Sequence, residues 1–188
     1  MKPVLLISSL ALVVALLASE VPTNVAVSPE LEVPTVNVPA KDRQENWIGR
    51  EGNGSCVHAS FVTLLRWQGR NYFADYWKSR YDSGESPEEF NRHLDAEGVR
   101  YAVTTAGDAG FLEWAMRTRR GACVVSHGGA HMETLVHLDA NSAGLIDNNF
   151  PEKFRWIPRN QFIAEWLEGP NGGWAITPVY TPAAPLPR

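Results

Sequence analysis

Clusters of basic residues are missing from this sequence. Lys and Arg number 17 against 21 Asp and Glu, which gives a net charge of −4, and no basic stripe is present that could follow a phosphate backbone. Nucleic acid is therefore excluded as an expected partner. No internal repeat is visible either, and the 188 residues, 44% of them hydrophobic, provide enough apolar material for one compact core but not for two. We expect a single folded domain.

The N-terminal hydrophobic run is too short for a membrane span. An uncharged run over residues 4–18 follows Lys2 and has the length of the hydrophobic region of a secretory signal, whereas a spanning helix needs roughly 20 residues. Leu16 or Leu17 falls where signal cleavage prefers a small residue, so a retained anchor is the alternative. We predict a signal peptide or membrane anchor over residues 1–19. The domain is then periplasmic, extracellular or tethered to a membrane on its outer side.

Cysteine is scarce, because Cys56 and Cys123 are the only two. In an oxidising compartment an even pair is often a disulfide. Cys123 lies in an apolar stretch that is expected to form a strand, and a bridge requires the two Cα atoms to lie about 4.4 to 6.8 Å apart. A cysteine inside a strand usually behaves as a small hydrophobic residue. Cys56 therefore has three interpretations: nucleophile, half of a disulfide, or packing residue.

Proline-rich segments flank the expected domain. Val-Pro and Ser-Pro steps recur over residues 20–45, and proline pushes the residue before it toward extended conformations, so we predict a linker there. Residues 181–188 are similarly rich in proline and are predicted to form a flexible tail. The pattern over residues 46–180 is globular and predicts the folded domain.

Apolar periodicity predicts helices first and strands mainly later. Ser55 is the expected N-cap of the first helix, Gly69 provides its stop, and the apolar residues between them recur at helical spacing. Further helices are expected over residues 72–81, 87–98 and 109–121, and short strands over residues 100–105, 122–127, 131–139, 143–147 and 173–179. This order predicts an α+β fold in which N-terminal helices pack on a C-terminal antiparallel β-sheet.

Cys56 lies where a helix start favours thiol chemistry. As the first residue after the Ser55 cap, it is near unpaired backbone N–H groups and the positive end of the helix dipole, which both favour thiolate over thiol. The preceding glycine-rich stretch, GREGNGS, permits the close approach of a substrate carbonyl, and the amide of Cys56 could help to hold an oxyanion. The alternative is a buried cysteine that only packs.

Among the five histidines, His131 is the predicted base for Cys56. His58 lies two residues from Cys56 and therefore points to a different face of the helix, whereas His93 falls in a charged helix that indicates solvated surface. His131 begins a strand just beyond the glycine pair in SHGGAH, so its ring can emerge at an end of the sheet where a cleft could form.

A third member of the site is expected after the next strand. The stretch DANSAG is typical of a turn, so the residues after it should run back antiparallel to the His131 strand. Side-chain alternation places Asp147 and Asn149 on one face and Asn148 on the other. Either Asp147 or Asn149 could accept a hydrogen bond from the imidazole, which is the orienting role in a catalytic triad.

A zinc site is the competing interpretation of the same stretch. His127, His131, Glu133 and His137 together look like a ligand cluster. In a strand that rises about 3.3 Å per residue, however, His131 and His137 lie roughly 20 Å apart and cannot share one ion. We expect no metal, with His137 at the edge of the core and His127 at the rim of the cleft.

The order of these residues resembles that of the papain-like cysteine peptidases, and most of all the bacteriocin-processing, double-glycine peptidases and their secreted relatives. In those families a cysteine opens the first long helix, as in GSCVHASFVTLLRWQG, and a histidine starts a later strand 16 residues before Asp or Asn, as His131 and Asp147 do here. The resemblance covers roughly residues 44–180, with IPRNQFIAEW similar to a later helix and GGWAITPV to the closing strand. It implies a papain-like fold and a thiol hydrolase that cleaves peptide or amide bonds of a peptide or protein substrate, with Cys56, His131 and Asp147 as its catalytic residues and no cofactor.

One position departs from that resemblance. The family usually places a Gln six residues before the cysteine to help bind the oxyanion, and this chain has Arg50 there. The side-chain amide of Asn53 or of Gln44 is the predicted substitute. A transglutaminase-like acyl transfer uses the same residues. A non-catalytic binding or surface-structural protein on the same fold is the further alternative.

Overall fold

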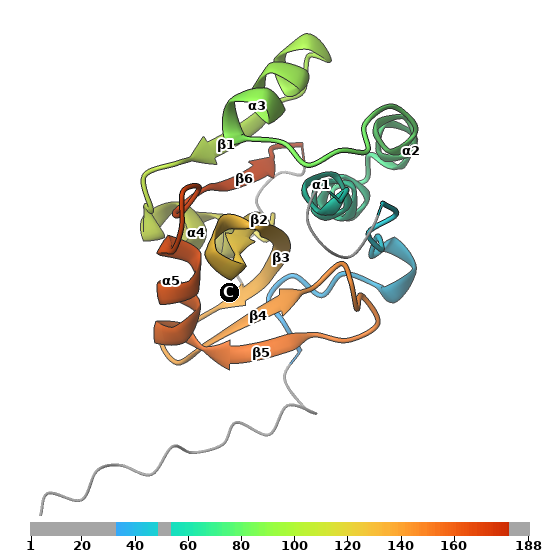
Figure 1. Cartoon of the computed structure of the whole chain (residues 1–188). Coiled ribbons are helices and arrows are strands. Elements are labelled where there is room, and N and C mark those ends of the chain that lie inside the picture. Colours follow the sequence, from blue (N-terminus) through green and yellow to red (C-terminus); the bar gives the residue numbers. More distant parts are fainter. Residues whose placement is uncertain (1–32, 49–53, 181–188) are drawn as a thin grey trace, which may run out of the picture. The chain divides into compact units, whose positions relative to one another are not determined.

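The computed structural model describes residues 33–48 and 54–180 (Figure 1), so the predicted signal or anchor and the predicted tail lie outside the described residues. Within these ranges the helices are α1 (Cys56–Trp67), α2 (Asn71–Arg80), α3 (Pro87–Ala96), α4 (Ala109–Arg117) and α5 (Arg159–Leu167). The strands are β1 (Tyr101–Thr104), β2 (Ala122–Ser126), β3 (His131–Leu138), β4 (Ser142–Ile146), β5 (Arg155–Pro158) and β6 (Ala175–Pro178), and the 3-10 turns are η1 (Ala40–Asp42) and η2 (His127–Gly129). None of the helices in this part of the chain is long and apolar enough to cross a membrane.

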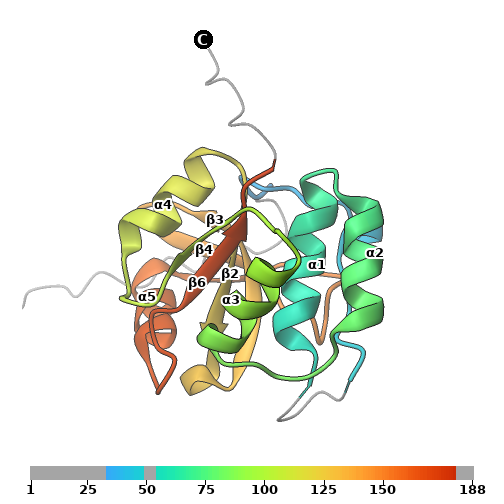
Figure 2. The ribbon, with the colours of Figure 1, turned by 90° about the horizontal axis from the view of Figure 1, so that it is seen from above.

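The described strands form one antiparallel sheet in the order β1-β6-β2-β3-β4-β5. Strand β6 inserts between β1 and β2, so the last described strand lies inside the sheet. Helix α1 packs against β2, β3 and β6, and α2 packs on α1. Helices α4 and α5 lie on the other side of the strands (Figure 2). Helices on an antiparallel sheet confirm the predicted α+β class.

Helix α1 forms where the apolar periodicity predicts it, and Gly69 follows it with a left-handed φ of 72°. Ser55 occupies the N-cap position, but its side chain makes no capping hydrogen bond. Its hydroxyl instead accepts the N–H groups of Trp47 and Ile48, at 2.9 and 3.1 Å. It also donates to Oδ1 of Asn46 at 2.6 Å. The predicted capping role of Ser55 is therefore wrong for its side chain, which ties the helix start to residues 46–48.

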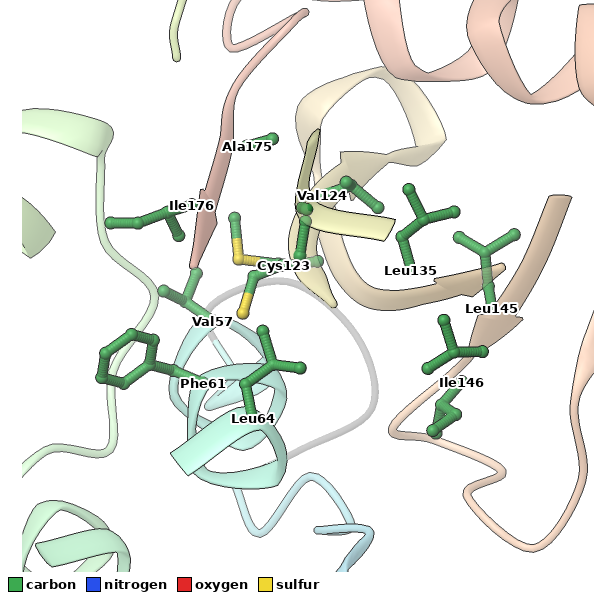
Figure 3. Close-up of a cluster of buried hydrophobic side chains, with 14 of the residues drawn as sticks. Val57, Phe61, Leu64, Cys123, Val124, Leu135, Leu145, Ile146, Ala175 and Ile176 are labelled. Atoms are coloured by element: carbon green, nitrogen blue, oxygen red, sulfur yellow. The ribbon is translucent and has the colours of Figure 1, made fainter. Parts of the chain in front are cut away.

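The core lies between α1 and the sheet. Figure 3 shows Val57, Phe61 and Leu64 of α1 facing Cys123 of β2 and Ile176 of β6. Each of these five residues has at most 5% of its surface exposed. Burial raises the pKa of the Cys123 thiol well above its ordinary value, so Cys123 is a hydrophobic residue of the core with little thiolate at neutral pH.

Part of the predicted linker over residues 20–45 belongs to the domain. Val36 and Val38 are fully buried. The Val36 N–H donates to the carbonyl of Val136 in β3 at 2.8 Å, and the alternation of buried and exposed side chains around Val36 is that of an extended chain on a sheet. The domain therefore begins before residue 46, which corrects the predicted boundary.

Five predicted strands are confirmed as β1, β2, β3, β4 and β6, with ends that differ by one or two residues. Strand β5 is missing from the prediction, because its sequence, RWIP, shows no clear alternation and ends in proline. Strand β4 ends at Ile146, before the predicted end at Asp147. The Phe150 N–H donates to the Asp147 carbonyl at 2.9 Å, so Asp147, Asn148 and Asn149 lie in a turn. Their predicted alternation between two sheet faces is therefore wrong.

The turn between β3 and β4 depends on Asp139. Its Oδ1 accepts the N–H groups of Asn141 and Ser142 at 2.7 Å each, and its Oδ2 lies 3.2 Å from Nε2 of His137. Burial alone would raise the pKa of Asp139, but these contacts lower it to about 2. Because this value lies below the unfolded value of about 3.9, the stabilisation by the carboxylate is present above pH 4 and is lost as the pH falls toward 2.

Replacement of Asp139 by alanine is expected to reduce the free energy of unfolding by about 1 kcal/mol at pH 6, since two turn hydrogen bonds of a half-exposed side chain are lost. The loss should shrink at pH 2.5, where the wild-type carboxylate begins to be protonated. Urea unfolding of both proteins at the two pH values measures it, with the exposed Asp82→Ala as a control. An equal loss at both pH values would contradict the role of the charge.

Candidate active site

Cys56, the first residue of α1, lies at a cavity of about 350 Å³. Only 6% of the residue is exposed, yet it lines the cavity together with His131, Met132 and Trp174. The N–H groups of the first helical turn and the positive end of the helix dipole are at this same end of α1. Cys56 therefore lies at a cavity next to the end of α1 that stabilises an anion.

His131 and Asp147 meet beside Cys56. His131 begins β3, and its Nε2 lies 2.9 Å from Oδ1 of Asp147, which follows the neighbouring antiparallel strand β4. The Asn149 N–H donates to the same Oδ1 at 2.9 Å and fixes the carboxylate. The imidazole also interacts with the side chain of Cys56. Because Asp147 occupies Nε2, the nitrogen left to face the sulfur is Nδ1.

The surroundings make His131 a strong base. Burial alone would lower the pKa of His131, but hydrogen bonds and charge interactions with Asp147 and Cys56 raise it to about 10. Burial would also raise the pKa of Asp147, but the His131 ring, the Asn149 N–H and the charge of His127 lower it overall. The imidazolium and the carboxylate are therefore both charged at neutral pH, and a cation beside the sulfur favours its thiolate form.

The loop before His131 is held by a close contact between the backbones of Gly128 and Gly169. His127, Gly128 and Gly129 have φ values of 51°, 65° and 85°, all left-handed. A Cβ atom on Gly169 would collide with the Gly128 carbonyl, so only glycine permits this contact. The contact sets where β3 begins and therefore where the His131 ring lies. His127 is exposed beside it, with ring centroids 5.6 Å apart, as predicted for a residue at the rim.

Asn148 joins the two halves of the site and was not among the predicted residues. Its side chain is 1% exposed, and Nδ2 donates to the carbonyls of Cys56 and Met132, at 3.0 and 2.7 Å, and to Oγ of Ser60 at 3.0 Å. Ser60 also donates to the Met132 carbonyl at 3.1 Å. These bonds fasten the start of α1 to the residue after His131. A turn containing Asn does not reveal such a role in the sequence, because turns commonly use Asn for local bonds.

Asn148→Leu is expected to lower the free energy of unfolding by about 2 kcal/mol, since the buried carbonyls of Cys56 and Met132 each lose one donor. It is also expected to slow alkylation of Cys56 by iodoacetamide at pH 6, measured at a temperature where the variant is fully folded. The exposed Asn141→Leu is the matched control. A less stable variant that keeps the full alkylation rate would show that Asn148 does not position Cys56.

Two other predicted residues make contacts of their own. The Asn149 side chain accepts a hydrogen bond from Nδ2 of Asn46 at 3.2 Å, and its backbone N–H donates to Asp147. Gln44 donates its Nε2 to the Glu45 carbonyl at 2.7 Å and accepts from Arg66 at 3.0 Å. This contact lies toward the far end of α1 from Cys56, which does not support the predicted oxyanion role of Gln44.

Asn53, the other predicted oxyanion residue, and Arg50 lie outside the described residues. Cys56 and Cys123 are both unbonded thiols. The structure therefore contains no bridge between them.

The other three histidines do not line the cavity at Cys56. His58 faces an aromatic cluster and is fully buried. His93 lies at the surface as predicted, with its side chain 41% exposed, and its ring stacks on Tyr81 with centroids 4.6 Å apart. His137, toward the other end of β3, contacts Thr35. In the described ranges no group of three or more His, Cys, Asp or Glu side chains could hold a metal ion, so the structure offers no support for the zinc alternative.

No protein-family model, no curated protein and no solved structure matches this chain.

Proposed function

We propose that the protein is a thiol hydrolase that cleaves peptide or amide bonds through Cys56, His131 and Asp147. One observation carries the proposal: a single imidazole, that of His131, is bound by Asp147 through Nε2 and interacts with Cys56, at a cavity that the cysteine and histidine both line. A nucleophile, a base and an orienting carboxylate in this relation are the parts of covalent acyl transfer.

The chemistry begins with the thiolate. Sγ of Cys56 bonds to the substrate carbonyl carbon, and the carbonyl oxygen becomes an oxyanion that the N–H groups at the start of α1 are suited to bind. His131 gives its proton to the leaving amine as the C–N bond breaks, which leaves a thioester. Water then attacks the thioester while His131 takes a proton from it, so the acid is released and the thiolate and imidazolium are restored.

We also propose that the fold is papain-like. The order of elements supports it: the cysteine opens the helix that packs on the sheet, and His131 and Asp147 lie at neighbouring ends of β3 and β4. The later helix and closing strand of the resemblance correspond to α5 and β6.

Two alternatives use the same residues. In a transglutaminase-like acyl transfer an amine replaces water as the acceptor of the thioester, with the same cysteine and histidine. A non-catalytic binding protein would have no need of a base, whereas the pKa of His131 raised to about 10 is typical of a residue tuned for chemistry. We therefore place the hydrolase first.

A product analysis tests the proposal. Peptides that contain Gly-Gly bonds are incubated with the protein, with and without a primary amine, and the products are identified by mass. Hydrolysis adds one water across the broken bond, whereas acyl transfer incorporates the amine. Cys56→Ala should give neither product. Cleavage that persists in Cys56→Ala would overturn the assignment.

Export of the domain is a separate part of the proposal. It rests on residues 1–19, which lie outside the described residues. The N-terminus of the protein recovered from expressing cells decides between a cleaved signal and a retained anchor. A chain that is recovered intact and soluble inside the cells would contradict both.

A further inference from the structure

The connection between α5 and β6 brings a polar residue to the cavity at Cys56. Residues 168–174 run beside the η2 turn that precedes His131 (Figure 2), and Asn171 in this connection lines the same cavity as Cys56 and His131. Asn171 is partly exposed, so a ligand in the cavity can reach it. No step of the proposed hydrolysis uses this residue.

Backbone contacts fix the position of Asn171. A Cβ atom on Gly169 would collide with the Gly128 carbonyl of η2, and a Cβ atom on Gly173 would collide with the backbone of Gly107. Both positions therefore require glycine, since no other residue lets two backbones approach so closely. The connection is held between η2 on one side and Gly107 on the other, with Asn171 in its middle.

Asn171 lies directly against the segment that leads into His131. A Cβ atom on Gly129 would lie 3.3 Å from the backbone nitrogen of Asn171 and 3.6 Å from its Cβ atom. Gly129 also lines the cavity, two residues before His131. Asn171 and the imidazole of His131 therefore border the cavity from segments that are in contact.

The usual reasons for an asparagine in a turn do not apply to Asn171. Asparagine serves turns by adopting a left-handed φ or by bonding its side chain to the nearby backbone. In the described ranges the non-glycine residues with a left-handed φ are Arg119 and His127. The Asn171 carbonyl accepts the Trp174 N–H at 3.1 Å, but the side-chain amide makes no hydrogen bond within the part of the chain that the structure describes. The amide is therefore available to a ligand.

The other polar side chains at this cavity are already engaged. Among its described lining residues, Cys56 and His131 perform the proposed chemistry, and Oγ of Ser86 accepts a backbone N–H as the N-cap of α3. The Glu85 carboxylate lies at ion-pair distance from two histidines that do not line the cavity, and Nε1 of Trp174 is enclosed. One side-chain amide is left to bind the main chain of a substrate.

We propose that Asn171 is a substrate-binding residue that holds the main chain of a peptide next to the bond attacked by Cys56. This inference rests on the proposed hydrolase function and names its substrate class. The side-chain amide matches a peptide main chain, because Nδ2 donates to a carbonyl and Oδ1 accepts an N–H. Asn171 thereby selects chains with a further peptide bond beside the one that is cleaved, and disfavours simple amides.

Exchange of single N–H groups in a peptide reagent tests this contact. Acetylated tripeptidyl chloromethyl ketones are prepared in which one amide at a time is replaced by an ester, which removes an N–H and keeps the shape of the chain. Labelling of Cys56 is followed by mass spectrometry. At one position the ester should slow labelling of the wild type at least fivefold, the size expected for one hydrogen bond, and labelling of Asn171→Ala less than twofold. In the wild type alone, the absence of an ester effect at every position would overturn the proposal.

Two further variants assign the effect to the side chain of Asn171. Asn171→Asp keeps an acceptor for the N–H and should retain the ester effect, as should Asn141→Ala, which removes an exposed asparagine from the turn between β3 and β4. Ester effects that are the same in the wild type and in a folded Asn171→Ala protein would remove the contact with Asn171 and leave the hydrolase. An iodoacetamide rate that is the same in the wild type and His131→Ala would instead remove the hydrolase.

Discussion

Replacement of His131 by alanine is expected to slow alkylation of Cys56 by iodoacetamide at pH 6 by tenfold or more. An ordinary thiol with a pKa near 8.5 is only about 0.3% ionised at pH 6, and alanine removes the imidazolium whose charge favours attack by the neighbouring sulfur. Because a more acidic thiolate is intrinsically less nucleophilic, the rate falls by less than the change in its ionised fraction.

The pH profile makes this prediction sharper. The pKa of His131 is raised to about 10, so the imidazolium persists throughout the neutral range, and the wild-type rate should change less between pH 6 and pH 9 than the rate of His131→Ala. In His131→Ala the rate should rise about tenfold per pH unit until an ordinary thiol is ionised. His137→Ala, which removes a histidine from the other end of β3, is the matched control. Identical profiles for His131→Ala and the wild type would contradict the pairing of His131 with Cys56.

Replacement of Asp147 by asparagine is expected to reduce hydrolysis of a cleaved peptide by between tenfold and about 10⁴-fold, since an orienting carboxylate in a triad has effects up to that size. The amide keeps the shape of Asp147 but removes the charge that lies 2.9 Å from Nε2 of His131. The pKa of His131 should then fall from about 10 toward its ordinary value. Because the leaving amine needs the proton of His131, the alkaline pH at which hydrolysis is lost should be lower in Asp147→Asn than in the wild type.

The alkaline limb of the hydrolysis profile measures this change directly. It should move down by more than one pH unit in Asp147→Asn and stay in place in Asp139→Asn, which removes a carboxylate from the opposite end of β3. Unchanged activity together with an unchanged alkaline limb in Asp147→Asn would show that Asp147 only supports the turn after β4.

Much of the fold follows from local patterns in the sequence. The helical spacing of apolar residues predicts α1, and alternation predicts β3, because both elements bury one face against the same core. Local sequence patterns do not predict strand β5 or the segment around Val36, since the stability of both comes from pairing with other strands of the sheet. The two fully buried valines, Val36 and Val38, are spaced two residues apart, a period that the frequent prolines nearby obscure.

The candidate site can also be predicted from the sequence only in part. Cys56 and His131 begin a helix and a strand, positions that the sequence marks with Ser55 and with the glycine pair before His131. Asp147 follows from the antiparallel return of the next strand. The partners of Gln44 and Asn149 depend on packing across the molecule, which the sequence alone does not reveal. Asn148 was missed for the same reason, because nothing local marks a turn residue that becomes buried.

The protonation state of the His131 ring tests the pairing of His131 with Cys56 most directly. Nuclear magnetic resonance of protein labelled with ¹⁵N in its histidines reports whether both ring nitrogens of His131 carry protons, with His131→Ala to assign the signal. The proposed pairing predicts that His131 is doubly protonated at pH 8, loses a proton only near pH 10 and titrates at lower pH in Cys56→Ser. A ring that titrates near pH 6.5 in the wild type and is insensitive to Cys56→Ser would contradict it.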